Sequence, residues 1–212
     1  MRGDAKVIEY LNQGLKSELT AINQYWLHYR ILDNWGYKEL ARTWRAESIE
    51  EMEHADTLTA RILFLEGYPN MQSLNPLRIG QTVQEIMDCD LAAENDARAF
   101  YLDAAKYCDS VNDRVSRILF EKLAQDEEEH IDFLETQLEL IRQVGLQLYA
   151  RKTGGVARPR ASDRRLWPLC LTRTRADNRT VRGEARKSLA DGLRYFASFG
   201  TGVASVLTGR TG

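Results

Sequence analysis

The chain has 212 residues, and its 29 Lys and Arg against 31 Asp and Glu leave a formal net charge of −2. A hydrophobic fraction of 43% with 28% charged residues argues against wholesale disorder. Apolar runs such as Ile62–Leu65 are too short to span a bilayer, and the N-terminus lacks the apolar core of a signal peptide. Three widely spaced cysteines without a CxxC pair favour a reducing compartment, so we expect a cytoplasmic protein without a disulfide framework.

Charge is distributed unevenly along the chain. Residues 1–150 contain 15 Lys and Arg and 27 Asp and Glu, which gives −12, whereas residues 151–212 contain 14 and 4, which gives +10. Eight of the 14 glycines also lie in the last 62 residues. We therefore predict one folded domain over 1–150 and a basic, Arg- and Gly-rich, poorly ordered extension over 151–212.

The first 150 residues read as four long helices. Few breakers interrupt the chain, and apolar residues recur in steps of three and four over the ranges 5–34, 37–66, 82–109 and 113–144. Gly36 and Gly67 are predicted to end the first two helices, and Thr82-Val-Gln-Glu85 resembles a capping box that opens the third. The pattern predicts an all-α four-helix bundle. The segment 67–81 is long enough to cross the bundle, which would make helices two and three parallel.

Ionisable side chains interrupt each apolar stripe at mid-helix. The six residues are Glu18, Glu51, His54, Glu94, Glu127 and His130. Two of the stripes carry a Glu-x-x-His motif, whose side chains can reach one point because three residues make nearly one helical turn. Every member of the first half recurs 76 residues later, as do Tyr25 and Tyr101. The two helical hairpins therefore look like equivalent halves that face each other.

Four buried carboxylates need compensation, because an isolated buried charge is very costly. Raised pKa values could neutralise some of them, but two divalent cations would balance four carboxylates directly. Carboxylate and imidazole ligands suit iron or manganese. A single Glu-x-x-His on a helix is usually a solvated pair. Two copies, each preceded by a glutamate at the same offset, favour the dinuclear carboxylate site of ferritin-like bundles.

The text around these residues resembles the bacterioferritin family. The similar segments are MRGDAKVIEYLN, ESIEEMEHAD, RILFLEG and DEEEHIDFLETQLELI, and the resemblance extends from Met1 to about Ala150. It implies a ferritin-like bundle with a short fifth helix, assembled from dimers into a 24-subunit cage. Such a cage is a ferroxidase that oxidises Fe(II) with oxygen or peroxide and stores the Fe(III) mineral. The resemblance makes Glu18 and His54 ligands of one iron, Glu94 and His130 ligands of the other, and Glu51 and Glu127 bridges.

The resemblance also assigns two residues near the ligands. Tyr25 matches a tyrosine involved in electron donation, although a core tyrosine with a satisfied hydroxyl would give the same pattern. Met52 matches the methionine that binds b-type haem, one haem per two subunits, whereas on its own it would be an apolar surface residue. Asn23 and Trp26 are candidates for lining the haem pocket. The haem would accept electrons from a ferredoxin-type reductant.

The chain departs from the family at several positions. Ala46 and Glu50 replace a histidine and an aspartate that often face the cavity, which puts an inner-surface iron site in doubt, and Phe133 stands where some members have tryptophan. The extension 151–212, with a possible helix near 184–197, is either a basic arm that binds nucleic acid, mineral or an acidic partner, or a read-through or frame-shifted end without selected function. We favour the second reading and expect no nucleic-acid partner.

Three other functions are compatible with parts of the sequence. One is a haem-binding cage without efficient ferroxidase activity. Another is a di-iron oxidase or peroxidase such as a rubrerythrin, although the expected CxxC-bearing domain is missing. The last is a DNA-binding stress cage, which only the basic extension favours.

Overall fold

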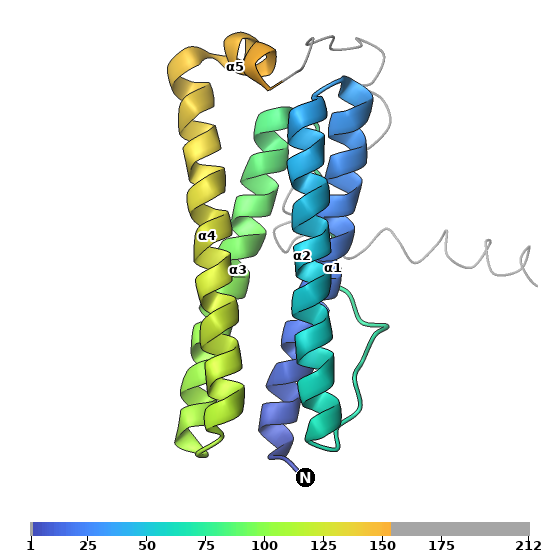
Figure 1. The fold of residues 1–212 in the computed structure, drawn as a ribbon, viewed down its shortest axis with the longest axis vertical. Coiled ribbons are helices and arrows are strands. Elements are labelled where there is room, and N and C mark those ends of the chain that lie inside the picture. The colour runs from blue at the N-terminus through green and yellow to red at the C-terminus, as the bar shows by residue number, and fades with distance from the viewer. Residues whose placement is uncertain (1, 154–212) are drawn as a thin grey trace, which may run out of the picture. The chain divides into compact units, whose positions relative to one another are not determined.

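The computed structural model describes residues 2–153, which form five α-helices (Figure 1). They are α1 (Ala5–Trp35), α2 (Lys38–Phe64), α3 (Val83–Ser110), α4 (Arg114–Val144) and α5 (Leu146–Lys152). α1 packs mainly against α2, and α3 packs mainly against α4. The predicted all-α bundle with a short fifth helix is confirmed. The extension from residue 154 onward, including the possible helix near 184–197, lies outside the described residues.

Side chains cap the starts of α1 and α3. The Asp4 carboxylate accepts hydrogen bonds from the backbone N–H groups of Lys6 and Val7 at the start of α1. The Thr82 hydroxyl accepts one from the Glu85 N–H, as the capping-box prediction requires. In a standard capping box the Glu85 carboxylate would accept from the N–H of the N-cap residue Thr82. Here it accepts from the N–H of the preceding residue, Gln81.

The ends of α1 and α2 differ from each other. α1 ends as predicted at Gly36, whose φ of 93° lies in the left-handed region that glycine adopts at low cost. The prediction that Gly67 ends the second helix is wrong. α2 ends at Phe64, and the left-handed residue is Glu66, with a φ of 61°. Gly67 instead permits a close approach, since a Cβ there would lie 2.8 Å from the Cγ2 atom of Ile8.

The segment between α2 and α3 runs along the outside of the bundle, so α2 and α3 are parallel, as predicted (Figure 1). Side chains of α1 bind its backbone. The N–H of Asn75 donates to the Thr20 hydroxyl at 2.9 Å, and the N–H of Arg78 donates to the Gln24 side chain at 2.8 Å. The crossover is therefore held against the helix that carries Glu18.

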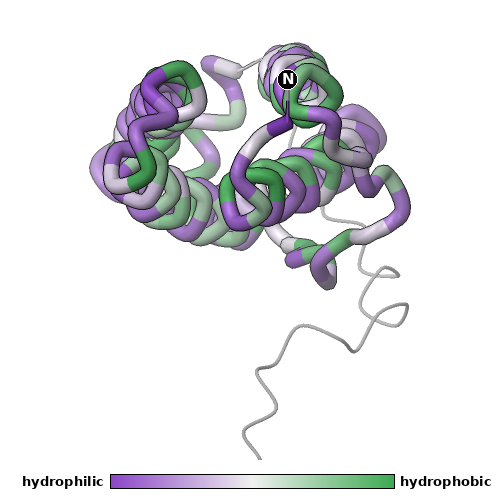
Figure 2. The backbone as a smooth tube through the Cα atoms, turned by 90° about the horizontal axis from the view of Figure 1, so that it is seen from below, coloured by the Kyte–Doolittle hydropathy of each residue, from purple (hydrophilic) through white to green (hydrophobic). Residues whose placement is uncertain are grey.

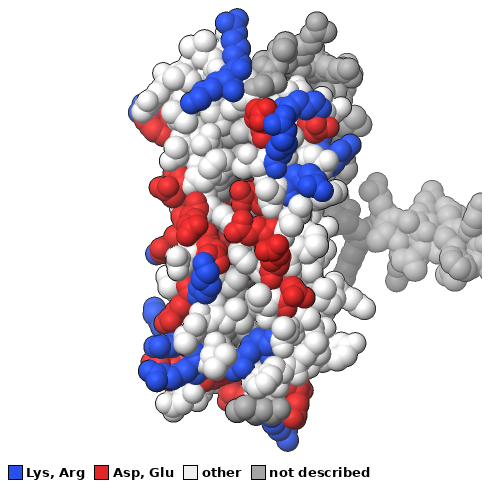
Figure 3. Space-filling view, in the orientation of Figure 1, with Lys and Arg blue, Asp and Glu red and all other residues white. Residues whose placement is uncertain are grey.

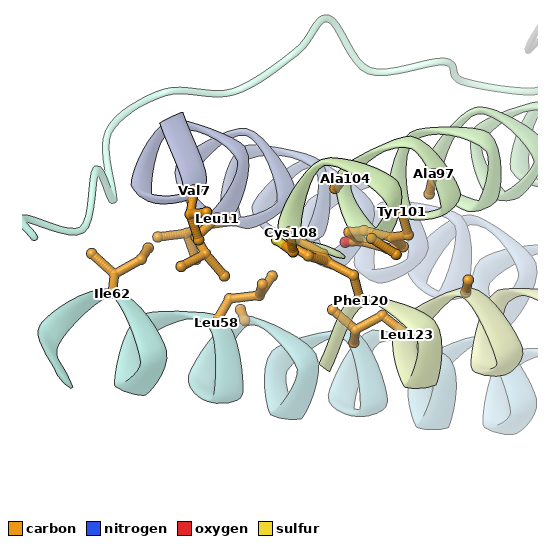
Figure 4. Packing of buried hydrophobic residues seen from close by; sticks show 14 of the residues in the cluster. Val7, Leu11, Leu58, Ile62, Ala97, Tyr101, Ala104, Cys108, Phe120 and Leu123 are labelled. Atoms are coloured by element: carbon orange, nitrogen blue, oxygen red, sulfur yellow. The ribbon is translucent and has the colours of Figure 1, made fainter. Parts of the chain in front are cut away.

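The apolar core is divided into two clusters. Figure 4 shows residues of the cluster that contains Leu11, and Figure 2 shows hydrophobic and hydrophilic residues interspersed along the helices. One contains Leu11, Leu58, Tyr101 and Phe120, and the other contains side chains such as Trp44. Along every long helix, the members of the two clusters are separated by the ionisable residues of the stripe. The fold thus places a polar layer between two apolar layers. Within the described part of the chain, no helix is long and apolar enough to cross a membrane.

Candidate metal centre

The six ionisable residues of the stripes meet between the two apolar clusters. α1 contributes Glu18, α3 contributes Glu94, and α2 and α4 each contribute a Glu-x-x-His pair. All six are buried, with exposed fractions of 7% or less. Their ligand atoms form two groups, each with its atoms within 4.8 Å of one another. The first group is Glu18, Glu51, His54 and Glu127, and the second is Glu51, Glu94, Glu127 and His130.

Two carboxylates belong to both groups. Glu51 lies 3.0 Å from Nδ1 of His54 through its Oε2 atom and 3.5 Å from Nδ1 of His130 through its Oε1 atom. Glu127 reaches the same His130 nitrogen at 3.4 Å. The two imidazole rings lie 6.2 Å apart between centroids. Glu51 and Glu127 therefore stand where ligands that bridge two metal positions would stand.

Burial determines the charge state of this cluster. Burial, together with the charges of Glu51 and Glu127, holds the pKa of Glu18 well above its usual range. Burial, Glu51 and Glu94 have the same effect on the pKa of Glu127. Without a cation, the cluster therefore neutralises part of its charge by taking up protons.

The two histidines and Glu94 respond in a complementary way. Burial alone would lower the pKa of His130, but the carboxylates of Glu94, Glu51 and Glu47 raise it to about 10. The pKa of His54 is raised because the interaction with Glu51 outweighs burial. The pKa of Glu94 is lowered, since its contacts with Glu127 and His130 outweigh burial. Each protonated imidazole supplies a positive charge to the cluster.

Three buried polar atoms of the cluster have no hydrogen-bond partner. They are Oε1 of Glu51, Oε2 of Glu127 and Nδ1 of His130. Buried polar atoms are normally satisfied, so such a set calls for an explanation. These atoms face one another across the second ligand group. The oxygen and imidazole donors suit iron or manganese, and cations at this place would satisfy all three atoms.

The outer nitrogens of both histidines face further acids. Nε2 of His54 lies 3.6 Å from Asp126, and Nε2 of His130 lies 3.3 Å from Glu47 and 3.8 Å from Glu50. Acidic side chains gather at mid-length over α2 and α4 on this face (Figure 3). Glu50 and Asp126 are again 76 residues apart, a spacing that could have identified them from the sequence. Ala46, in contrast, offers no ligand atom.

Two tyrosines donate hydrogen bonds to the cluster. The Tyr25 hydroxyl donates to Glu94, and the Tyr101 hydroxyl donates to Glu18. Burial and the charges of Glu94 and Asp90 raise the pKa of Tyr25 well above its usual range, so this phenol stays protonated. Tyr25 was predicted as a site residue and Tyr101 was not, although the 76-residue offset relates the two.

A second buried polar network lies one helical turn from Glu94 and was also missed. Asp90 accepts hydrogen bonds from the indole N–H of Trp44 at 2.7 Å and from the Gln24 amide at 2.8 Å. Nδ1 of His28 lies 2.9 Å from the same carboxylate, and its Nε2 accepts from the Gly80 N–H. The network links three helices to the end of the crossover. The ring of Phe133 packs against Trp44 at 6.2 Å between centroids.

A cavity of about 510 Å³ leads to the four carboxylates from the side of the crossover. Its walls come from α1, α3 and the crossover, and include Ala21, Pro76 and Ala97. Arg78 and Asp96 form an exposed ion pair at 2.5 Å, and both line the cavity. Small molecules thus have a way to the buried cluster that does not pass the acidic face over the histidines.

Met52 lies away from the cluster. Its exposed fraction is 50%, and Ile49 and Trp26 are also exposed at 36% and 44%. The guanidinium of Arg45, one heptad before Met52 on α2, lies 6.0 Å from the centroid of the Trp26 ring. Asn23 on α1 is exposed as well. Met52 is therefore accessible to a ligand or a second chain on the outer face of α1 and α2.

Comparisons with known proteins agree with the fold described above. The model of the ferritin-like domain matches residues 8–144. The chain is 56% identical to a bacterioferritin of Brucella melitensis over 151 residues, which cover 71% of this chain and 94% of that protein. The chain belongs to the bacterioferritin family.

Two further relatives are also bacterioferritins. The chain is 57% identical to the bacterioferritin of Rhodobacter capsulatus over 150 residues, or 71% of this chain and 93% of that protein. A solved structure of a Rhodobacter capsulatus bacterioferritin superimposes with a TM-score of 0.72 at 54% identity, covering 76% of this chain and 99% of that one. That structure is described as having a metal-free dinuclear site and a haem iron. Family membership and the carboxylate–histidine cluster together fit iron binding.

Proposed function

We propose that this member of the bacterioferritin family is a ferroxidase, which oxidises Fe(II) to Fe(III) at two metal positions within each chain. The observation that carries the proposal is the pair of ligand groups that share Glu51 and Glu127 at the buried centre of the bundle. Iron storage is the general role of the family. The oxidised iron would be stored as mineral inside a cage built from copies of this chain.

The composition of the two ligand groups suggests which metal position each residue would bind. Each ligand group contains one glutamate and one histidine that the other group lacks. We therefore assign Glu18 and His54 to one metal position and the pair Glu94 and His130 to the other. The two shared carboxylates are assigned as bridges. Two divalent cations carry +4, which offsets four carboxylates once both imidazoles are neutral. Metal binding would therefore displace the protons that the metal-free cluster takes up.

The protein supplies the surroundings for the reaction. Bound iron would supply one-electron redox chemistry toward oxygen or peroxide. The apolar clusters close the site on both sides along the helices, and the cavity beside the crossover gives the oxidant a route to it. Tyr25 holds the orientation of Glu94 through its hydroxyl, and we propose it as an electron donor to the site. The acids beside Nε2 of His54 and His130 attract cations to the opposite side.

The proposal also covers the number of subunits and the haem site. We propose a 24-subunit cage built from dimers, in which Met52 residues from two copies bind one b-type haem. The exposed apolar face around Met52, with Trp26 and Ile49, supports this placement, and Asn23 borders it. The haem would pass electrons from a ferredoxin-type reductant to the stored mineral. A cytoplasmic location stays a prediction, as does the role of residues 151–212.

Rapid mixing tests the ferroxidase proposal. The assembled metal-free protein is loaded anaerobically with two Fe(II) per chain and then mixed with oxygenated buffer. We expect a fast rise in near-ultraviolet absorbance from Fe(III), lost in Glu18→Ala and His130→Ala. Glu53→Gln, an exposed acid on α2, is the matched control and keeps the fast phase. Equal rates in wild type and both ligand variants would rule out the proposed centre and favour a haem-binding cage without this activity.

A further inference from the structure

A stripe of side chains on α1 binds the backbone of the crossover, residues 65–82. Its members Thr20, Gln24 and His28 are four residues apart, so they lie on the same face of the helix. Each accepts a hydrogen bond from the crossover, at distances of 2.9, 2.8 and 3.2 Å. The donors, in the same order, are the backbone N–H groups of Asn75, Arg78 and Gly80. The crossover is therefore attached to α1 at each of these points.

Part of the attached crossover covers the cavity that leads to the carboxylates. Residues 75–78 line this cavity together with residues of α1 and α3. Thr20 and Gln24 hold this part on the α1 side, and both also line the cavity. On the α3 side the Arg78 guanidinium pairs with Asp96, but the pair is exposed, and exposed ion pairs contribute little. The attachment to α1 therefore determines most of the position of this cover.

Asp90 of α3 orients the Gln24 side chain. The Asp90 side chain is fully buried, and its Oδ1 accepts a hydrogen bond from the Gln24 amide NH₂ at 2.8 Å. The amide oxygen of Gln24 therefore faces the N–H of Arg78. Oδ2 of Asp90 accepts from the indole N–H of Trp44 at 2.7 Å. Nδ1 of His28 lies 2.9 Å from both oxygens.

We propose that Asp90 is a positioning residue, which holds the crossover over the proposed route to the metal centre and so limits the access of small molecules. Asp90 acts through Gln24, because it fixes which atom of the Gln24 amide meets the crossover. Loss of this attachment lets the cover move away from α1, and small molecules then reach the centre faster. The route belongs to the proposed function, on which this inference rests.

The replacement Asp90→Asn keeps the shape of the side chain and reverses its hydrogen-bond pattern. The indole N–H of Trp44 can only donate, so the new amide turns its oxygen toward Trp44 and its NH₂ toward Gln24. The Gln24 amide must turn to accept this bond, which presents its own NH₂ to the N–H of Arg78. Two donors then face each other, and the attachment at Arg78 is lost. His28 keeps a bond to the remaining oxygen.

Hydrogen exchange, resolved to single residues by mass spectrometry, measures the attachment. In the assembled metal-free protein, the Arg78 amide is expected to exchange about tenfold faster in Asp90→Asn, because it loses one hydrogen bond. Gln24→Met removes the acceptor and keeps the charge of Asp90, and it is expected to have the same effect. The Gly80 amide is the internal reference in both variants, since its partner His28 keeps its place.

Nitric oxide measures access to the metal. It is a neutral diatomic molecule like O₂, and it binds Fe(II) with a change in visible absorbance and without oxidising the metal. The assembled protein is loaded anaerobically with Fe(II) and mixed with nitric oxide at several concentrations. We expect the second-order rate constant to rise several-fold in Asp90→Asn and in Gln24→Met. Asp88→Asn, the same change at an exposed position on α3, is the control and keeps the wild-type rate.

The outcomes separate this proposal from the function on which it rests. Wild-type exchange of Arg78 in both variants would show that Asp90 does not hold the crossover. Faster exchange with unchanged nitric oxide binding would show that the crossover does not limit access. Faster binding in Asp90→Asn alone would trace to the lost charge, and it would equally overturn the proposal. If wild type binds nitric oxide but does not oxidise Fe(II) with oxygen, the proposed function fails, while the same two measurements still decide the role of Asp90.

Circular dichroism and size-exclusion chromatography check that each variant is folded and assembled. Gln24→Met keeps the hydrogen bonds of Asp90 to Trp44 and His28, so it is the milder change. If Asp90→Asn does not assemble, Gln24→Met alone decides the outcome, with faster exchange of Arg78 and faster nitric oxide binding as the expected result. Wild-type values of both in Gln24→Met would then overturn the proposal.

Discussion

The replacement Glu127→Gln is expected to stabilise the metal-free protein. The Glu127 side chain is buried, its Oε2 has no hydrogen-bond partner, and burial with the charges of Glu51 and Glu94 raises its pKa well above the usual range. At pH 8 the unfolded chain carries this carboxylate fully charged in water, so folding includes the cost of burying or protonating it. The amide keeps the shape and removes the charge. We expect a gain of about 1–3 kcal/mol, the usual cost of an unsatisfied buried polar group.

The same replacement is expected to weaken stabilisation by metal. A metal that binds only the folded state at 100 times its dissociation constant adds about 2.7 kcal/mol per site. Glu127 belongs to both ligand groups, so its loss weakens both positions. The order of stabilities therefore reverses: the variant is more stable than wild type with a chelator and less stable with metal.

Calorimetry of the assembled protein measures both effects. Thermal unfolding is recorded at pH 8 with EDTA and with Co(II), which substitutes for Fe(II) without being oxidised by air. A change of 1 kcal/mol corresponds to about 2–4 °C for a chain of this size. Glu129→Gln, an exposed neighbour on α4, is the control and is expected to follow wild type. A variant that is destabilised in EDTA, or stabilised by Co(II) as much as wild type, would refute the reasoning.

Three further predictions follow from other parts of the molecule. Burial raises the pKa of Glu47 from 4.5 to about 7, so its stabilising contribution is complete below pH 4.5 and is lost as the pH rises through 7. Of the stability that the metal-free protein loses over this range, Glu47 is expected to account for at most about 3 kcal/mol, so Glu47→Gln is expected to lose less than wild type in denaturation at pH 5, 6 and 7. Asp90→Ala leaves the buried donors of Trp44 and His28 without their acceptor, so it is expected to lower the free energy of unfolding by about 3–5 kcal/mol. Unfolding in guanidinium measures this loss, and a loss below about 1 kcal/mol would show that the network is dispensable. Met52→Leu is expected to abolish haem binding without altering helix content, measured by the visible spectrum together with circular dichroism; retention of a full haem band would remove Met52 as a ligand.

Much of the fold was predictable because local signals agreed with one another. The periodic apolar stripes gave the long helices, and Gly36 and the Thr82 capping box marked two boundaries correctly. The end of α2 was predicted wrongly, because a glycine in the sequence has two possible reasons. It can take the left-handed conformation that ends a helix, or it can make room for a neighbouring side chain, and the sequence does not distinguish the two. At this turn Glu66 takes the left-handed conformation, and Gly67 makes room for Ile8.

The centre was predictable where a repeat supported the chemistry. Six ligand candidates followed from the Glu-x-x-His motifs and the common offset, and the structure brings their ligand atoms together. The Asp90 network was not predictable, because Gln24, His28 and Trp44 come from two other helices and have no shared spacing with Asp90. The cavity beside the crossover depends on a segment without periodicity, so only the three-dimensional structure shows it.

In the proposed centre, a pair of cations holds the four buried carboxylates together. X-ray diffraction from crystals loaded anaerobically with Fe(II), collected on both sides of the iron absorption edge, tests it most directly. We expect two anomalous peaks per chain, with Glu51 and Glu127 contributing an oxygen to each. An absence of iron between α2 and α4, or glutamates turned toward solvent, would contradict it.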